Sequence, residues 1–294
     1  MKEMQRQFDI ITDSGCDMPK AYLEKHAVAC VKLGFTMNNV NYEGEEGEPI
    51  SEKEFYQKLR DGAMPTTYQV TGEAAQKYIR ASLEKGRDVL VIAFSSGLSG
   101  TADSFAVAAR ELSKKFRDRK ILVVDSLCAS MGEGLFLDYI IRYADGGASI
   151  EDTARYAEDL KLNICHHFTV DNLFHLKRGG RVSSMTAIVG SMLKIKPIMK
   201  VDDNGKLVPT GKAMGRKKSL KTLVDNLFES METVDENEPI FISHGDCIED
   251  VEYVIGLIKE RLPKAKITVN YVGSVIGTHS GCGTLAIFNK GKQR

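Results

Sequence analysis

Residues 88–101 read DVLVIAFSSGLSGT. Residues 89–94 are a continuous apolar run that is too short for an amphipathic helix, which predicts a buried strand of a parallel sheet. Serine and glycine residues follow, and Thr101 suits the N-cap of a helix predicted over 101–116. A strand, a loop and a helix in this order indicate a parallel α/β sheet, in which ligands bind beyond the carboxyl ends of the strands.

The same alternation continues on both sides of this stretch. It predicts strands over 8–12, 28–35, 88–94 and 120–124, and helices over 51–61, 71–85, 101–116, 129–144 and 150–163. From residue 165 onward the pattern changes to strands over 168–170, 195–201, 207–210, 240–243, 267–272 and 285–288, with helices over 183–193, 216–233 and 248–261.

An Asn204-Gly205 turn between two apolar runs predicts a hairpin in the second half, and so an antiparallel pair that the first half lacks. We therefore expect two α/β domains. The first, residues 1–165, has a parallel sheet flanked by helices, and the second, residues 166–294, has a mixed sheet and helices.

Composition limits the function classes. The 294 residues include 40 basic and 40 acidic side chains, so a net charge of zero offers no general attraction for nucleic acid. No apolar run approaches the roughly 20 residues that span a bilayer, and no leader precedes the first strand, so we expect a cytoplasmic protein. The six cysteines are scattered singly, and we interpret them as reduced thiols without a metal.

Two loops combine hydroxyl groups with turn residues. Ser95 and Ser96 lie between a strand and a helix, where free backbone N–H groups and the helix dipole favour an anion, although ordinary turn chemistry explains the same residues. Thr66 and Thr67 follow Pro65 in a segment that on its own fits a simple helix cap. These hydroxyls are candidates for binding a negatively charged group.

Two further residues suit the same chemistry. Arg181 follows Gly179-Gly180, a pair that permits a close backbone approach, and it offers a bidentate grip on a carboxylate or phosphate. His279 lies in a glycine-rich segment over 277–284 that we expect to be a loop, and His244 is a weaker candidate of the same kind. Taken singly, such an arginine is more often a solvated charge, and such a histidine is usually an incidental loop residue.

Asp13, Asp17 and Asp125 follow predicted strands and form an alternative, a magnesium cluster, because hard cations prefer such oxygen ligands. No nucleotide-binding loop of the Walker type accompanies them.

Taken in order, these loops resemble the DegV family of fatty-acid-binding proteins over nearly the whole chain. The matching stretches are ITDSGCDMP (11–19), PTTYQ (65–69), SSGLSGT (95–101), VDSLCASMGEG (124–134), FTVDNLFHLKRGGRVS (168–183), LKIKPIM (193–199) and GTHSGCGTLAI (277–287).

The resemblance implies that a long-chain fatty acid is the bound ligand, held in the cleft between the two domains, with no other cofactor and no metal. Its carboxylate would be held by Thr67 with Thr66 beside it, by Ser96 with Ser95 as the close alternative, and by Arg181 and His279. It also implies a carrier rather than an enzyme, whose partner is a separate fatty-acid kinase subunit that makes an acyl phosphate for phospholipid synthesis. A transient contact with a membrane surface fits this role, and nucleic acid does not.

The alternative is a phosphotransferase or hydrolase, because the first domain is also similar to one found in dihydroxyacetone kinases. A regulatory DNA-binding protein is a third reading, which the lack of a basic face disfavours.

Two positions depart from the family pattern. Tyr68 replaces a small hydroxyl residue next to the proposed anion site, and Cys282 replaces the usual proline. The tyrosine has three possible roles: it supplies another O–H donor, it shortens the tunnel, or it points away from the site. We expect an acyl tunnel lined by Tyr68 and by the predicted helix over 183–193, which supplies Met185, Ile188, Val189 and Met192. The same helix residues fit the core of the second domain.

Overall fold

The computed structural model describes residues 6–171, 173–182 and 194–294. The strands are β1 (Phe8–Asp13), β2 (Val28–Val31), β3 (Gly34–Met37), β4 (Val40–Glu43), β5 (Thr66–Tyr68), β6 (Asp88–Ala93), β7 (Ile121–Asp125), β8 (Ile164–Thr169), β9 (Ile195–Val201), β10 (Leu207–Met214), β11 (Ile240–His244), β12 (Ile267–Tyr271) and β13 (Leu285–Lys290). The α-helices are α1 (Lys20–Lys25), α2 (Glu52–Arg60), α3 (Gly72–Leu83), α4 (Thr101–Ser113), α5 (Met131–Asp145), α6 (Ile150–Leu160), α7 (Phe174–Arg178), α8 (Arg216–Ser230), α9 (Ile248–Arg261) and α10 (Ser274–Ser280).

The first sheet is parallel and has the strand order β2-β1-β6-β7. Successive residues of β1 point to opposite faces, because side chains alternate along a strand. Ile11 belongs to the core that α3 and α4 cover, and Ile10 belongs to the core that α5 and α6 cover. The sheet is therefore buried on both faces, as the continuous apolar run over 89–94 predicts.

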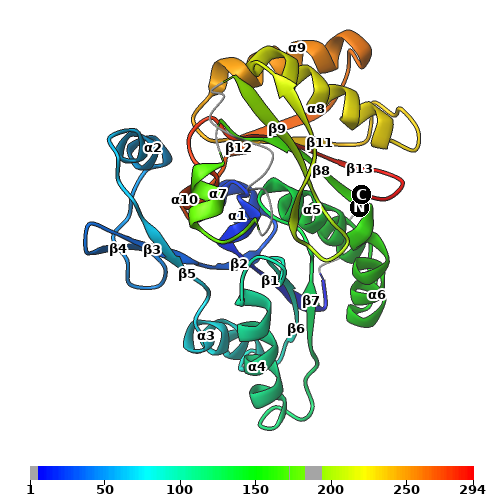
Figure 1. Cartoon of the computed structure of the whole chain (residues 1–294). Helices are drawn as coiled ribbons and strands as arrows, with labels where there is room; N and C mark the ends of the chain where they lie inside the picture. The colour runs from blue at the N-terminus through cyan, green and yellow to red at the C-terminus, as the bar shows by residue number, and fades with distance from the viewer. Residues whose placement is uncertain (1–5, 172, 183–193) are drawn as a thin grey trace.

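The second sheet is mixed and has the order β10-β9-β8-β13-β11-β12. Helices α8 and α9 cover one of its faces, and α5 packs on the other by contacting β8, β11 and β13. Helix α5 thus lies between the two sheets (Figure 1). One continuous core joins Phe8 of the first sheet, Phe136 of α5 and Phe288 of the second sheet. The expected α/β class with a parallel and a mixed sheet is confirmed, and the boundary near residue 165 stays a prediction.

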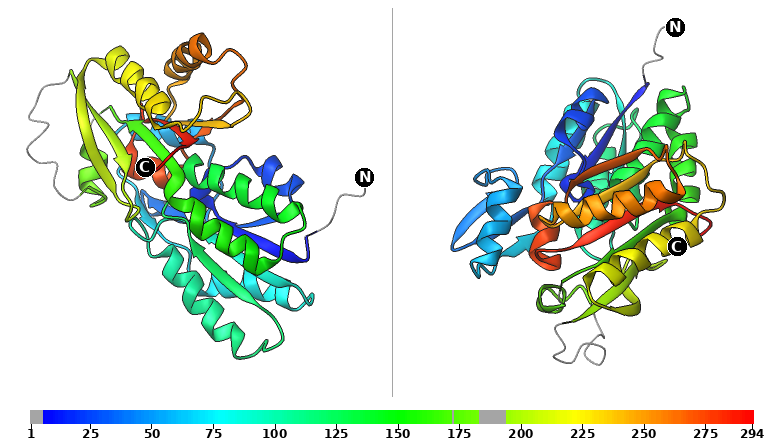
Figure 2. Two further views of the ribbon diagram at one scale, coloured as in Figure 1. Left: turned by 90° about the vertical axis from the view of Figure 1, so that its right-hand side faces the viewer. Right: turned by 90° about the horizontal axis from the view of Figure 1, so that it is seen from above.

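A third, three-stranded sheet was not predicted. The segment over 28–35, which we predicted as one strand, is two strands, because β2 ends at Val31 and β3 begins at Gly34 and turns away to pair antiparallel with β4 and β5. The prediction that the first half lacks antiparallel pairs is therefore wrong. With α2, this sheet forms a small lobe that projects from one side of the molecule (Figures 1 and 2).

Two predicted loops are regular elements. The stretch with Thr66 and Thr67 is strand β5, and His279 lies in helix α10 rather than in a loop. Helix α10 contacts α2, α7, β3 and β5, and such packing stabilises a short helix that glycine residues would disfavour in isolation. Gly281, at φ 81°, ends it. The N-cap of α4 is also Gly100 rather than Thr101, which is the first residue of the helix.

Candidate binding site

A cavity of about 370 Å³ lies among β8, β9, β11 and β13 of the mixed sheet, α10, β5 and the β6–α4 loop. Most of its wall is apolar, which suits a hydrocarbon ligand. The apolar lining residues are Leu33, Phe94, Leu98, Ala129, Phe168, Leu176, Val201, Leu207, Val272, Val275, Ile276, Ala286 and Phe288.

A small polar group at one part of the wall consists of Thr67, Arg181 and His279. The hydroxyl oxygen of Thr67 lies 2.8 Å from Nε2 of His279, although these residues come from β5 and α10, far apart in the sequence. Gly179 lies directly behind the imidazole, since a Cβ added there would be 2.1 Å from Nδ1 of His279. The glycine is needed because any larger residue would displace the ring.

Arg181 and Arg178 make this part of the cavity cationic. Arg181 donates from Nε to the carbonyl of Leu98 in the β6–α4 loop at 3.2 Å, so the guanidinium lies close to the positive N-terminal end of α4. Arg178 donates to the carbonyls of Pro65 at 3.0 Å and Thr278 at 3.3 Å, and thereby joins the segment before β5 to α10. An anion placed here gains from both the charges and the dipole.

The imidazole of His279 is neutral at pH 7. Burial, followed by the charges of Arg181, Arg178 and His175, lowers the pKa of His279 to about 4. With its proton on Nε2, the ring donates to the oxygen of Thr67 and leaves the Thr67 hydroxyl hydrogen free for an anion. The three residues together can therefore present a hydroxyl donor and a guanidinium to one carboxylate.

Three of the predicted carboxylate residues do not line the cavity. Ser95 is buried and donates from its hydroxyl to the carbonyl of Gly205 at 2.8 Å, which ties the β6–α4 loop to the β9–β10 hairpin. Ser96 is exposed, and its backbone N–H donates to Asp125. Thr66 is exposed, since it points away from Thr67 along β5. Leu98, Ser99 and Gly100 of the same loop line the cavity instead.

Tyr68 forms part of the cavity wall. Its hydroxyl lies against the backbone of Gly34 in β3 and of Gly44 just after β4. A Cβ added at Gly34 would be 2.2 Å from that oxygen, and one added at Gly44 would be 2.6 Å from it. Cys282 lies elsewhere and donates from its thiol to the carbonyl of Tyr56 at 3.5 Å. The other predicted tunnel residues, Met185, Ile188, Val189 and Met192, fall outside the described residues.

The cavity also contains polar residues that the sequence did not single out. They include Gln69, His166 and the hydroxyl residues Ser130, Ser243, Ser280 and Thr284. Ser280 and Thr284 lie within the glycine-rich segment 277–284 around His279, but nothing in the sequence predicts that Ser130 and Ser243 from distant segments line the same cavity. The antiparallel pairing of β11 with β13 brings Ser243 near the segment that ends in Thr284, and the packing of α5 on the second sheet adds Ser130.

The alternative magnesium ligands serve the local backbone or neighbouring side chains. Asp13 accepts from the backbone N–H groups of Gly15 and Phe94, and Asp125 accepts from those of Ser96 and Leu127. Asp17 accepts from the hydroxyl of Ser130. Among the described residues, no group of three or more His, Cys, Asp or Glu side chains is placed to hold a metal ion.

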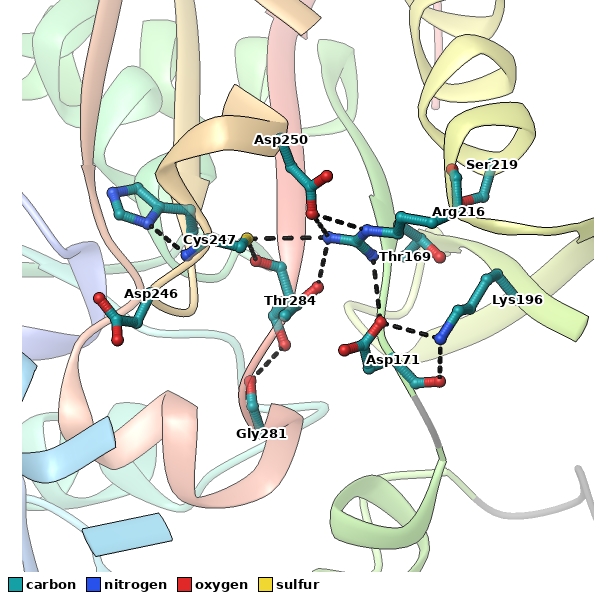
Figure 3. A network of polar contacts seen from close by, with 12 residues as sticks. Thr169, Asp171, Lys196, Arg216, Ser219, Asp246, Cys247, Asp250, Gly281 and Thr284 are labelled. Carbon is teal, nitrogen blue, oxygen red and sulfur yellow. Dashed lines mark hydrogen bonds and ion pairs between the residues drawn. The ribbon is translucent and has the colours of Figure 1, made fainter. Parts of the chain in front are cut away.

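Arg216 lies at the centre of a polar network that joins the chain just after α10 to the chain just before α7 (Figure 3). It donates to Asp250 at 2.8 Å and to the carbonyl of Gly283 at 2.6 Å, just beyond α10, and its Nη1 lies 3.8 Å from the carboxylate of Asp171, just before α7. Lys196 donates to the same Asp171 carboxylate at 2.9 Å. This network is suited to positioning α10 relative to α7.

A family model described as "Uncharacterised protein, DegV family" matches residues 7–291. The chain belongs to the DegV family. A DegV domain-containing protein of Clostridium perfringens is 42% identical over 287 residues, covering 96% of this chain and 97% of that one. Protein DegV of Bacillus subtilis is 32% identical over 287 residues, covering 95% of this chain and 97% of that one.

Solved structures of the family have the same fold. A fatty-acid-binding DegV family protein from Thermus thermophilus superimposes with a TM-score of 0.87 at 28% identity, covering 98% of this chain and 100% of that one. DegV of Bacillus subtilis, described as a fatty acid binding protein, gives 0.82 at 29% identity with the same coverage. Within the described part of this chain, no helix is both long and apolar enough to cross a membrane.

Proposed function

We propose that this protein binds a long-chain fatty acid, with the acyl chain in the apolar cavity and the carboxylate at Thr67, Arg181 and His279. The observation that carries the proposal is that one largely apolar cavity is lined by a guanidinium, an imidazole and a hydroxyl that meet at one place. The solved relatives from Thermus thermophilus and Bacillus subtilis, which are described as fatty-acid-binding, support it.

The two ends of the ligand contribute differently. Each methylene that leaves water contributes about 0.8 kcal/mol, so the chain supplies most of the affinity. Burying the carboxylate costs several kcal/mol unless charge-assisted donors replace its water, and Arg181 and Thr67 are the available donors. The tail therefore sets the strength of binding, and the polar group sets its orientation.

The proposal includes a handover step. A separate fatty-acid kinase phosphorylates the bound carboxylate in the cytoplasm, and the acyl phosphate enters phospholipid synthesis. This chain then acts as a carrier that needs no nucleophile or general base of its own. The partly exposed side of the cavity near Arg181 is where the kinase would reach the carboxylate, and a transient encounter with a membrane surface would supply the acid.

Native mass spectrometry of the purified protein tests the binding step. We expect one fatty acid per chain, which exchanges for an added acid of different mass. Recovering neither a bound nor an exchangeable fatty acid contradicts the proposal.

Calorimetry with Mg-ATP tests the carrier role against a phosphotransferase. We expect no heat of nucleotide binding to this chain alone, and acyl phosphate only after a fatty-acid kinase is added. Acyl phosphate formed by this chain and Mg-ATP without a kinase favours the enzyme.

A further inference from the structure

The formal net charge of the chain is zero, but its basic residues are distributed unevenly along the sequence. Residues 177–221 contain 12 lysine and arginine residues and only two acidic ones, Asp202 and Asp203. This segment includes β9, β10 and the start of α8. An excess of one charge sign on part of a surface attracts a partner of the opposite sign.

The structure gathers part of this charge at one corner of the second sheet. The β9–β10 pairing places Met214 opposite Ile195, and the backbone N–H of Gly215 donates to the carbonyl of Lys194 at 2.7 Å. Helix α8 begins at the next residue, so the start of β9, the end of β10 and the start of α8 meet. Four exposed lysines of these segments form what we call the basic corner: Lys194, Lys212, Lys217 and Lys218.

The charge of the basic corner is not neutralised within the described part of the chain. None of its four lysines forms an ion pair there, whereas Lys196 and Arg216 beside it both contact Asp171 (Figure 3). The four ammonium groups are therefore available to a partner. Our expectation that the chain lacks a basic face is wrong at this corner.

Exposed apolar side chains accompany the lysines. Met214 is 59% exposed, and it projects from the same face of β10 as Lys212, two residues earlier. Tyr253 of α9 is 38% exposed, and the ammonium of Lys217 lies 6.0 Å from the centre of its ring. Methionine and tyrosine are enriched in protein–protein interfaces, so the corner has the composition of a docking surface.

Acidic residues beside the corner distinguish between kinds of negatively charged partner. Helix α9 begins next to the start of α8, because Arg216 pairs with Asp250, and its first two turns carry the exposed residues Glu249 and Glu252. A bilayer of anionic lipids or a nucleic acid is negative throughout, so these carboxylates would repel it. A protein can present acidic residues to the lysines and basic residues to the glutamates.

Ionic contacts connect the basic corner to the binding site. Arg216 donates to the carbonyl of Gly283 just beyond α10, and it contacts Asp171 just before α7. Helix α10 carries His279, and Arg181 follows α7. A partner docked on the corner therefore contacts a network that leads to both residues.

We propose that the basic corner, together with Met214 and Tyr253, is the docking surface for a partner protein with an acidic face, and that this partner is the fatty-acid kinase of the proposed function. The inference rests on that function and names where its partner binds.

The test measures acyl phosphate formed by the fatty-acid kinase of the same organism and Mg-ATP, at increasing concentrations of the full chain loaded with fatty acid. Lys217→Glu/Lys218→Glu replaces attraction by repulsion, and it should raise the half-saturating concentration of the chain by roughly 2- to 30-fold. This increase should shrink at high salt, because the charges are exposed. Met214→Ala should raise the same concentration by about 5-fold or more.

Lys114→Glu/Lys115→Glu is the matched control. It also reverses two adjacent exposed lysines, at the end of α4, and makes the same change in net charge. It should leave the half-saturating concentration unchanged. Glutamate is favourable in the first turn of a helix, so the Lys217→Glu/Lys218→Glu variant should fold, and native mass spectrometry should find its fatty acid still bound.

Equal effects of the two double variants overturn the inference, and the proposed function stands if the wild type yields acyl phosphate. The inference also fails if Lys217→Glu/Lys218→Glu slows only the uptake of fatty acid from phosphatidylglycerol vesicles, which would assign the corner to a membrane surface. A wild type that binds fatty acid but yields no acyl phosphate contradicts the handover and this inference together. A wild type that binds no fatty acid contradicts the proposed function itself.

Discussion

Gly179→Ala should damage the carboxylate site without disturbing the backbone. Gly179 has φ −74°, a conformation that alanine adopts without strain. An added Cβ would lie 2.1 Å from Nδ1 of His279, so the imidazole has to retreat by more than about 1 Å to reach van der Waals separation. The push comes from the Nδ1 side, so Nε2 either presses against the Thr67 oxygen or rotates away from it, and the 2.8 Å hydrogen bond between His279 and Thr67 loses its geometry.

The expected magnitude follows from that lost contact. Without His279 to orient it, the Thr67 hydroxyl no longer donates to the ligand carboxylate. A hydrogen bond to such a charged group contributes about 1.5–3 kcal/mol, so affinity for a fatty acid should fall by roughly 10- to 150-fold. The methyl ester of the same acid carries no charge and should lose much less. Fluorescence competition or calorimetry with both ligands measures the acid-over-ester preference directly.

Two variants control this prediction. Gly180→Ala adds a Cβ with no atom within 4 Å but at φ 69°, so it strains the backbone while leaving His279 in place. It should lower thermal stability and keep the acid-over-ester preference. In a His279→Ala background the clash is absent, and Gly179→Ala should have no further effect on binding. A Gly179→Ala effect that persists in that background refutes the reasoning.

The other predictions concern residues around the same cavity. Arg216→Ala should lower the acid-over-ester preference by roughly 3- to 10-fold. Arg261→Ala is the control, because it breaks a 3.2 Å ion pair with Asp225 elsewhere on α8 and α9 and should leave that preference unchanged. Equal effects of the two variants would argue against a positioning role for Arg216. The pKa of His279 is about 4 without ligand, and a bound carboxylate raises it. Binding of the fatty acid should therefore be accompanied by proton uptake at His279. The affinity should increase as the pH falls below the raised pKa of His279, as long as the carboxyl group of the fatty acid stays ionised. Calorimetry in two buffers of different ionisation enthalpy measures this uptake, and finding the same uptake in His279→Gln would assign it to another group. Tyr68→Ser removes a ring from the cavity wall. In a series of saturated fatty acids, the chain length that binds best should therefore increase. An unchanged best chain length would show that the ring does not limit the tunnel.

The sequence predicts the two large sheets because their strands are short apolar runs between amphipathic helices. It does not predict the small lobe, since only Lys32 and Leu33 separate β2 from β3 and the apolar pattern continues across them. What divides the two strands is the pairing of β3 with β4 and β5, which is a long-range contact that local patterns do not contain.

The candidate site is predicted in part. Arg181 and His279 are marked by neighbouring glycines, and the structure brings them to one cavity with Thr67. Ser95 also lies close to glycines in the sequence, but its hydroxyl bonds to Gly205 of a distant hairpin. No local sequence signal distinguishes a hydroxyl that faces a ligand from one that joins two loops. Ser130 and Ser243 are missed for the converse reason, because they come from distant segments and line one cavity only through the packing of α5 on the second sheet.

A crystal structure of the protein with a bound fatty acid tests the central claim most directly. The account predicts that the carboxylate lies within hydrogen-bonding distance of the Thr67 hydroxyl and the Arg181 guanidinium, next to His279, with the chain extending along the apolar wall past Phe168 and Phe288. A carboxylate found at the Ser130 and Ser243 hydroxyls instead, or an acyl chain outside this cavity, would contradict it.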